Sequence, residues 1–317
     1  MLPENPKIRA AAFSITGAFC LAVIKLIIAI SSGSMAVMAS AVDSLLDILM
    51  SGVNFMAIRQ AEQPADDCHP FGHGKYETLA TFFQALVITL SGGWIIYESS
   101  TRLAYGEGLE NVDQGIGILA FSALVSWFIA SYLKKIAKQT DSSALEADSL
   151  HFRMDIYSNL GLMTGLLLIR WLEINWIDSA LSILVASYIL HEAIQLIKRS
   201  LTDMLDQELP EEIKQQVHEL ITSDEAHFSG YHGLRTRRAG SLKIMDFHLE
   251  VCKEMSVYEA HQIADHLEKK IEQNIPGADV IIHIEPCLKG DCPGRINCDE
   301  NKTRVKGSEW TLKTERD

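Results

Sequence analysis

The sequence predicts an α-helical membrane bundle of six transmembrane helices, followed by a C-terminal cytosolic α+β domain. Three observations lead to this prediction. Apolar residues are gathered into six long blocks, these blocks end after Arg199, and alternating apolar and polar positions follow them. Each block has about 20 residues or more, the length that crosses a ~30 Å hydrocarbon core as a helix.

Composition and charge exclude several other classes. The 317 residues contain 28 Lys and Arg against 41 Asp and Glu, a net charge of −13, which argues against nucleic acid as a partner. Apolar residues make up 48% of the chain, too many for a disordered or collagen-like protein.

Short linkers separate the predicted spans, which favours an up-and-down bundle. Turn residues such as Ser31 to Ser34 mark the ends of the helices. Ser143 and Glu146 have the spacing of a capping box that would start the fifth helix near residue 144. The six spans are predicted at residues 9–30, 35–58, 79–99, 114–133, 144–170 and 176–197.

The basic residues near the span ends predict the orientation, because short basic loops are retained in the cytosol. One side of the bundle carries only Arg102 and Arg170. We therefore expect a multi-pass protein of the inner (plasma) membrane with both termini in the cytoplasm. The opposite, cytoplasmic side carries nine basic residues: Lys7, Arg9, Arg59, Lys75, Lys134, Lys135, Lys138, Lys198 and Arg199.

The pattern after the spans is that of a small α+β domain. An amphipathic helix begins at Pro210-Glu211-Glu212 and ends near Ser223. Period-two alternation predicts strands over 242–252 and 279–285, joined by a helix over 256–274. With a short strand near 234–238, the order is α-β-β-α-β. The expected domains are 1–200 for the bundle, 201–287 for the α+β domain and 288–317 for a flexible, Cys-containing tail.

Ionisable residues inside the spans are the most informative feature of the sequence, since each costs on the order of 3 kcal/mol in the membrane. Asp43 and Asp47 are four residues apart in the second span, and His151 and Asp155 have the same spacing in the fifth. Each pair therefore lies on one helical face. A lone intramembrane Asp can be a packing or pore residue, but two such pairs indicate a four-coordinate site for a divalent transition metal.

These motifs resemble the cation diffusion facilitator family, and within it the bacterial zinc and ferrous-iron efflux branch (YiiP type). The similarity also includes the loop from His69 to Lys75 and covers the chain to about residue 287. The resemblance implies a metallochaperone-like cytosolic domain and a transport site formed by Asp43, Asp47, His151 and Asp155. Family members that favour manganese commonly have Asp at this His, so His151 argues for Zn²⁺ or a similar metal.

The resemblance implies two further metal sites on the cytosolic side. Asp66, His69 and His73 would bind one ion, although solvated loop histidines are an equal alternative from spacing alone. Strand alternation places His248 on a polar face and puts His283 and Glu285 together on another. Relatives usually have Asp where this chain has Glu285, which leaves the geometry of the second ion open. The full family-like set is His232, His248, His261, His283 and Glu285, at the interface of a homodimer formed by the cytosolic domains.

Three cysteines at the end of the α+β domain and in the predicted tail leave two interpretations open. Cys287, Cys292 and Cys298 have a spacing unlike that of a zinc ribbon. They are either incidental residues of an unstructured tail or a metal-binding group. Disulfides are not expected, because cytosolic thiols stay reduced.

Chemistry links the predicted site to proton exchange, because metals and protons compete for carboxylate and imidazole atoms. The resemblance therefore implies a secondary active transporter and not an enzyme, with protons, divalent ions and the lipid bilayer as partners. The main substrate would be Zn²⁺, with Fe²⁺, Cd²⁺ or Co²⁺ as alternatives, and Zn²⁺ would also be a structural ion. A membrane-anchored metal sensor is the other functional alternative. A hydrolase is disfavoured, because the sequence has no His-Glu-x-x-His motif.

Overall fold

The computed structural model describes residues 5–32, 35–105, 116–172, 176–223 and 228–287. The chain divides into two compact units. The first contains the residues up to Leu205 together with Ala239–Ser241, and the second begins at Asp206 and contains the rest.

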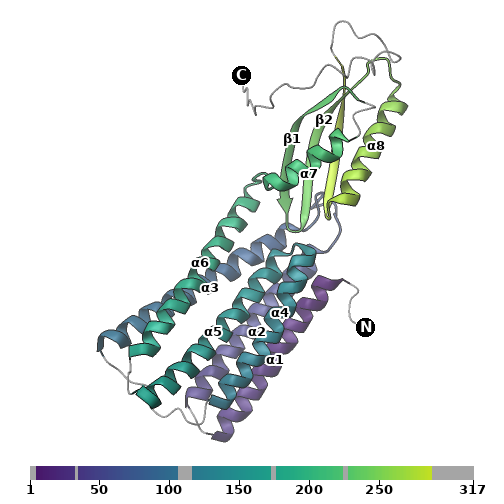
Figure 1. The fold of residues 1–317 in the computed structure, drawn as a ribbon. Coiled ribbons are helices and arrows are strands. Elements are labelled where there is room, and N and C mark those ends of the chain that lie inside the picture. The colour runs from purple at the N-terminus through teal and green to yellow at the C-terminus, as the bar shows by residue number, and fades with distance from the viewer. Residues whose placement is uncertain (1–4, 33–34, 106–115, 173–175, 224–227, 288–317) are drawn as a thin grey trace. The chain divides into compact units, whose positions relative to one another are not determined.

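The first unit is built from six long helices (Figure 1). Each predicted span corresponds to one helix, although residues 114 and 115 of the fourth predicted span lie outside the described residues. Their bounds are α1 Pro6–Ser32, α2 Met35–Ala61, α3 Lys75–Tyr105, α4 Ile116–Thr140, α5 Ser143–Leu172 and α6 Trp176–Met204.

Membrane-spanning character is clear for only part of this set. Among the described residues, the stretches Pro6–Ile28 and Lys75–Ala104 are long and apolar enough to cross a membrane. The prediction of six spans is therefore confirmed only in part.

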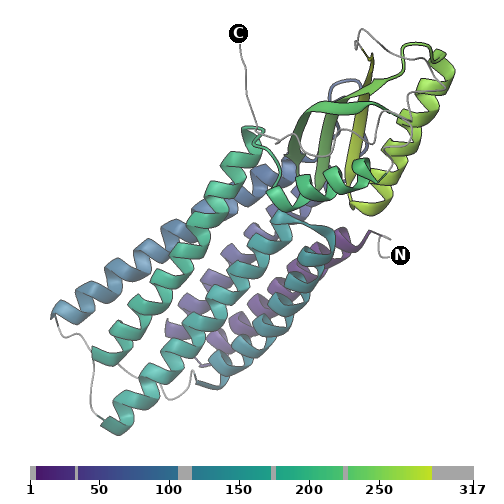
Figure 2. The same cartoon turned by 45° about the horizontal axis from the view of Figure 1, so that its top comes forward.

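The helices of this unit form two groups. In both Figure 1 and Figure 2, α1, α2, α4 and α5 lie side by side, while α3 pairs with α6. Leu133, Leu145 and Phe152 lie in a buried apolar cluster of the four-helix group. Gly17 permits close packing of α1 on α4, since a Cβ atom there would lie 2.5 Å from Cδ1 of Ile129.

A buried carboxylate connects four helices of the unit. Asp148 of α5 is 0% exposed and accepts hydrogen bonds from Ser14 of α1 at 2.5 Å and from Gln84 of α3 at 3.2 Å. The Ser14 hydroxyl also lies 3.2 Å from that of Ser51 on α2. These hydrogen bonds compensate in part for burying the polar groups and favour one relative placement of the helices.

The start of α5 differs from the predicted capping box. The hydroxyl of Ser142, and not that of Ser143, accepts a hydrogen bond from the backbone N–H of Leu145 at 3.3 Å. Ser143 instead accepts from Thr81 at 3.0 Å, and Glu146 accepts from Arg199 at 2.9 Å. The prediction was wrong because tertiary partners on α3 and α6 take up both side chains.

The second unit has the predicted α-β-β-α-β order. Its elements are α7 Glu211–Thr222, β1 Gly230–Ala239, β2 Leu242–Val251, α8 Val257–Asn274 and β3 Ala278–Pro286. The strands form one sheet in the order β1-β2-β3, and β2 and β3 are parallel. Ser256 caps α8 and forms a capping box with Glu259.

The core of this unit lies between one face of the sheet and the helices α7 and α8. Phe247 of β2, Ile282 of β3 and Leu267 of α8 belong to one buried cluster, which also includes Ile221 of α7. The alternating positions of β2 and β3, among them His248 and His283, therefore lie on the other face.

We expect Phe247→Ala to lower the free energy of unfolding of the 206–287 fragment by about 3–5 kcal/mol, because Phe247 is only 1% exposed in this core. Urea denaturation followed by circular dichroism measures the change. Ile281→Ala is the matched control, since Ile281 is 59% exposed and its loss should change stability by about 0.5 kcal/mol or less. Equal effects of the two substitutions would contradict this assignment of the core.

Candidate metal sites

The first candidate site joins α2 and α5 within the helical bundle. Nε2 of His151 lies 3.0 Å from Oδ1 of Asp47. One ligand atom each from Asp47, His151 and Asp155 lie within 4.8 Å of one another. His151 is 6% exposed, so an ion bound here would be largely shielded from solvent.

Asp43 lies one helical turn before Asp47 on α2, but its side chain is outside the described part of the structure. The structure thus brings together three of the four predicted ligands. Close by, the buried ammonium group of Lys25 donates a hydrogen bond to the hydroxyl of Ser44 at 2.8 Å.

The three described groups offer two carboxylates and one imidazole nitrogen. This mixture suits a divalent transition metal, whereas Mg²⁺ and Ca²⁺ prefer oxygen ligands alone. Buried carboxylates carry a large desolvation cost unless a cation or a proton compensates their charge. The cluster can therefore hold either a metal ion or protons.

The second candidate site lies in the loop between α2 and α3. The carboxylate of Asp66 is 3.3 Å from Nδ1 of His69 and 3.3 Å from Nε2 of His73. Asp66 also accepts hydrogen bonds from the backbone N–H groups of His69 and Cys68, at 2.6 and 2.9 Å. The His69 hydrogen bond is the main cause of a lowered pKa of Asp66, which favours the ionised, ligating form.

The third candidate site lies on the polar face of the sheet in the second unit. Glu285 of β3 lies 2.7 Å from Nδ1 of His248 and 3.5 Å from Nε2 of His232. Nε2 of His283 lies 3.8 Å from the same carboxylate. The structure therefore brings His232, His248, His283 and Glu285 together.

Strand register explains this arrangement. In the parallel pair, His248 stands opposite His283, and Glu250 stands opposite Glu285. The contact with His248 is the main cause of a lowered pKa of Glu285, so its carboxylate stays ionised around neutral pH. The Glu side chain at position 285 reaches His248 and His232.

Two further residues concern the predicted set. His261 lies exposed on α8, and within the described part of this one chain no contact joins it to the cluster, so its role at a dimer interface stays a prediction. Glu250 was not predicted, yet its carboxylate lies 3.8 Å from Nδ1 of His232. Its position two residues after His248 on the same strand face was the signal that could have identified it.

The cysteines add little to these clusters. Cys287 is buried at the end of the domain, where the hydroxyl of Ser229 lies 3.5 Å from its sulfur. Cys292 and Cys298 lie outside the described residues.

Comparison with known proteins covers both units. Residues 11–205 match the model of the cation efflux transmembrane domain, and residues 209–287 match that of the cytoplasmic domain of cation efflux proteins, a dimer-forming domain. The cation-efflux pump FieF of Yersinia pestis (strain Pestoides F) is 34% identical over 281 residues, which cover 88% of this chain and 93% of the relative. FieF of Yersinia pseudotuberculosis serotype O:3 (strain YPIII) has the same identity and coverage.

Two of the matching solved structures correspond to about a quarter of the chain. The zinc form of CzrB is 38% identical, with 26% of this chain and 92% of that chain covered and a TM-score of 0.23. The metal-bound C-terminal domain of the CzcD transporter from Thermotoga maritima is 23% identical, with 25% and 93% covered and a TM-score of 0.24.

Two domain models account for most of the sequence, and relatives more than 30% identical extend over nearly all of it. The chain therefore belongs to the cation efflux family, whose members are membrane transporters of divalent metal cations and not enzymes.

Proposed function

We propose that the protein exports a divalent metal cation, most readily Zn²⁺, in exchange for protons across the inner (plasma) membrane. The observation that carries this proposal is the buried cluster of Asp47, His151 and Asp155, with 3.0 Å between the first two side chains. Asp43 completes the proposed transport site. The FieF relatives are named as cation-efflux pumps, which supports the direction of transport.

The exchange follows from competition for the same atoms. A metal ion binds deprotonated carboxylates and neutral imidazole, so it displaces protons when it enters. Protons arriving from the other side of the membrane reverse the binding and release the metal. The cycle requires two conformations that differ in metal and proton affinity, each open to one side.

The ligand set restricts the substrate without selecting a single metal. One imidazole with carboxylates suits Zn²⁺, and Fe²⁺, Cd²⁺ and Co²⁺ are alternatives of similar ligand preference. We propose Zn²⁺ as the main substrate, and we propose that both termini face the cytoplasm. Residues 1–200 form the transport domain, residues 201–287 the metal-binding domain, and residues 288–317 a tail.

We propose that Asp66, His69 and His73 bind a second ion beside the membrane. In the cytosolic domain, His232, His248, His283 and Glu285 bind further ions, with Glu250 as an additional ligand. These ligands are half-buried or exposed, so an ion there is within reach of a second protomer. Metal binding would thus strengthen the homodimer, because ligands that bind only the assembled state stabilise it.

We expect Asp47→Asn to reduce metal uptake into proteoliposomes under a pH gradient by roughly 100-fold or more, since it removes a ligand charge from the transport site. Uptake is measured with a metal-sensitive dye inside the vesicles. Glu98→Gln is the control, because Glu98 pairs with Arg102 near the C-terminal end of α3 and is not one of the proposed ligands. This variant should retain most of the transport activity. Normal flux through Asp47→Asn would rule out this transport site.

We expect Zn²⁺ to shift the 205–287 fragment from monomer to dimer, as measured by sedimentation velocity with and without chelator. Glu285→Ala should weaken this shift, since Glu285 contacts both His248 and His232. His266→Ala on α8 is the matched control and should respond to Zn²⁺ like the unsubstituted fragment. Identical sedimentation profiles with and without metal would disprove the bridging role.

A further inference from the structure

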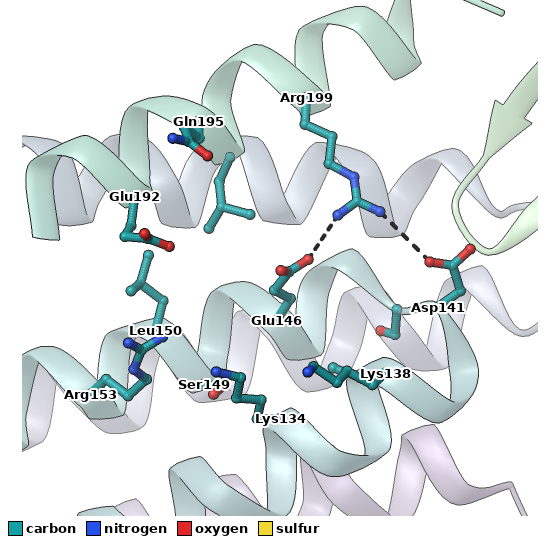
Figure 3. A pocket seen from close by; sticks show the side chains of 13 residues that line it. Lys134, Lys138, Asp141, Glu146, Ser149, Leu150, Arg153, Glu192, Gln195 and Arg199 are labelled. Carbon is teal, nitrogen blue, oxygen red and sulfur yellow. Dashed lines mark hydrogen bonds and ion pairs between the residues drawn. The ribbon is translucent and has the colours of Figure 1, made fainter. Parts of the chain in front are cut away.

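A polar cavity of about 680 Å³ lies at the end of the helical bundle where α4 ends and α5 begins, apart from the three metal clusters. Its lining includes the buried side chains of Leu150, Ser149 and Leu196. Around them stand charged groups from three helices (Figure 3). Its volume falls in the range of ligand-binding pockets.

Four basic side chains line this cavity. Lys134 and Lys138 lie four residues apart on α4, Arg153 comes from α5, and Arg199 comes from α6. These four basic side chains thus line one cavity in a chain whose net charge is −13.

Three carboxylates share the cavity, and Arg199 engages two of them. It lies 2.9 Å from Glu146 and 3.7 Å from Asp141, and Figure 3 shows it extending from α6 toward both. Arg153 donates hydrogen bonds to the neutral hydroxyls of Tyr188 and Tyr157, at 3.1 and 3.4 Å, so these contacts leave its positive charge in place.

The two lysines lack such counter-ions. Within the described part of the chain, no hydrogen bond or ion pair engages Lys134 or Lys138. Since Glu146 and Asp141 pair with Arg199, the lining has three further cations, Lys134, Lys138 and Arg153, against the single remaining carboxylate of Glu192. An anion with several oxygen atoms can accept hydrogen bonds from more than one of these cations.

We propose that this cavity binds a phosphate-bearing anion, supplied by the headgroup of an anionic membrane lipid or by a soluble phosphate. The lysines and Arg153 hold the phosphate oxygens, and Leu150 and Leu196 contact the apolar part of the ligand. Basic pockets between membrane helices are known to recognise anionic headgroups by this chemistry. None of the proposed metal ligands lines this cavity, so the proposal can be tested separately from the proposed function.

The test is the binding of defined probes to the full-length protein in detergent, measured by native mass spectrometry. The probes are phosphatidylglycerol, phosphatidylcholine and inorganic phosphate. We expect selective binding of one anionic probe and a loss of roughly 10- to 30-fold in affinity when Lys134→Ala and Lys138→Ala are combined. Preference for phosphatidylglycerol over phosphatidylcholine identifies the lipid source, and competition by millimolar inorganic phosphate identifies the soluble one.

The matched control is the double variant Lys135→Ala with Lys198→Ala, which removes the same charge from α4 and α6 outside the cavity lining. It should bind the probe like the unsubstituted protein. Equal losses in the two double variants, or no loss in either, would overturn the proposal. Glu192→Gln is a second test. It removes a carboxylate from the cavity lining and should therefore increase the affinity for the anionic probe. Unchanged or weaker binding by that variant would also count against the site.

Discussion

The hydrogen bonds to the buried carboxylate of Asp148 constrain the helices that carry the cluster of Asp47, His151 and Asp155. Ser14 of α1 and Gln84 of α3 both donate to this group on α5, and Ser14 also contacts Ser51 of α2. His151 follows Asp148 by three residues on the same helix, so the placement of α5 against α2 decides whether His151 meets Asp47. Apolar packing alone tolerates small slips of one helix along another, whereas misplacing these buried polar groups would leave them without partners.

Charge compensation is the second constraint within the bundle. Asp47 and Asp155 are partly buried beside His151, and Lys25 is 8% exposed nearby. Separated charges in such surroundings are costly, and the cost falls when opposite charges or protons neutralise them. In the proposed transport cycle, exchange of metal for protons thus needs no chemical group beyond the ligands themselves.

Local periodicity predicted most of the fold. The six helices and the order of the second unit depend on residues close together in sequence, so their patterns can be read directly. The start of α5 could not be predicted, since Thr81 and Arg199 compete for Ser143 and Glu146 from distant parts of the chain. The sequence also identified the residue types that can bind a metal. Which of these residues lie close together depends on strand register and on the face that each helix covers. That is why Glu250, which lies near His232, was missed.

The two faces of the small sheet have separate tasks. The face covered by α7 and α8 contains Phe247, Leu249 and Ile282, whereas the opposite face carries His248, His283 and Glu285. Side chains on the second face can be exchanged without disturbing the apolar packing on the first. Over evolutionary time, the proposed ligands on this face could therefore change by single substitutions, while selection for a foldable core acts on a different set of codons.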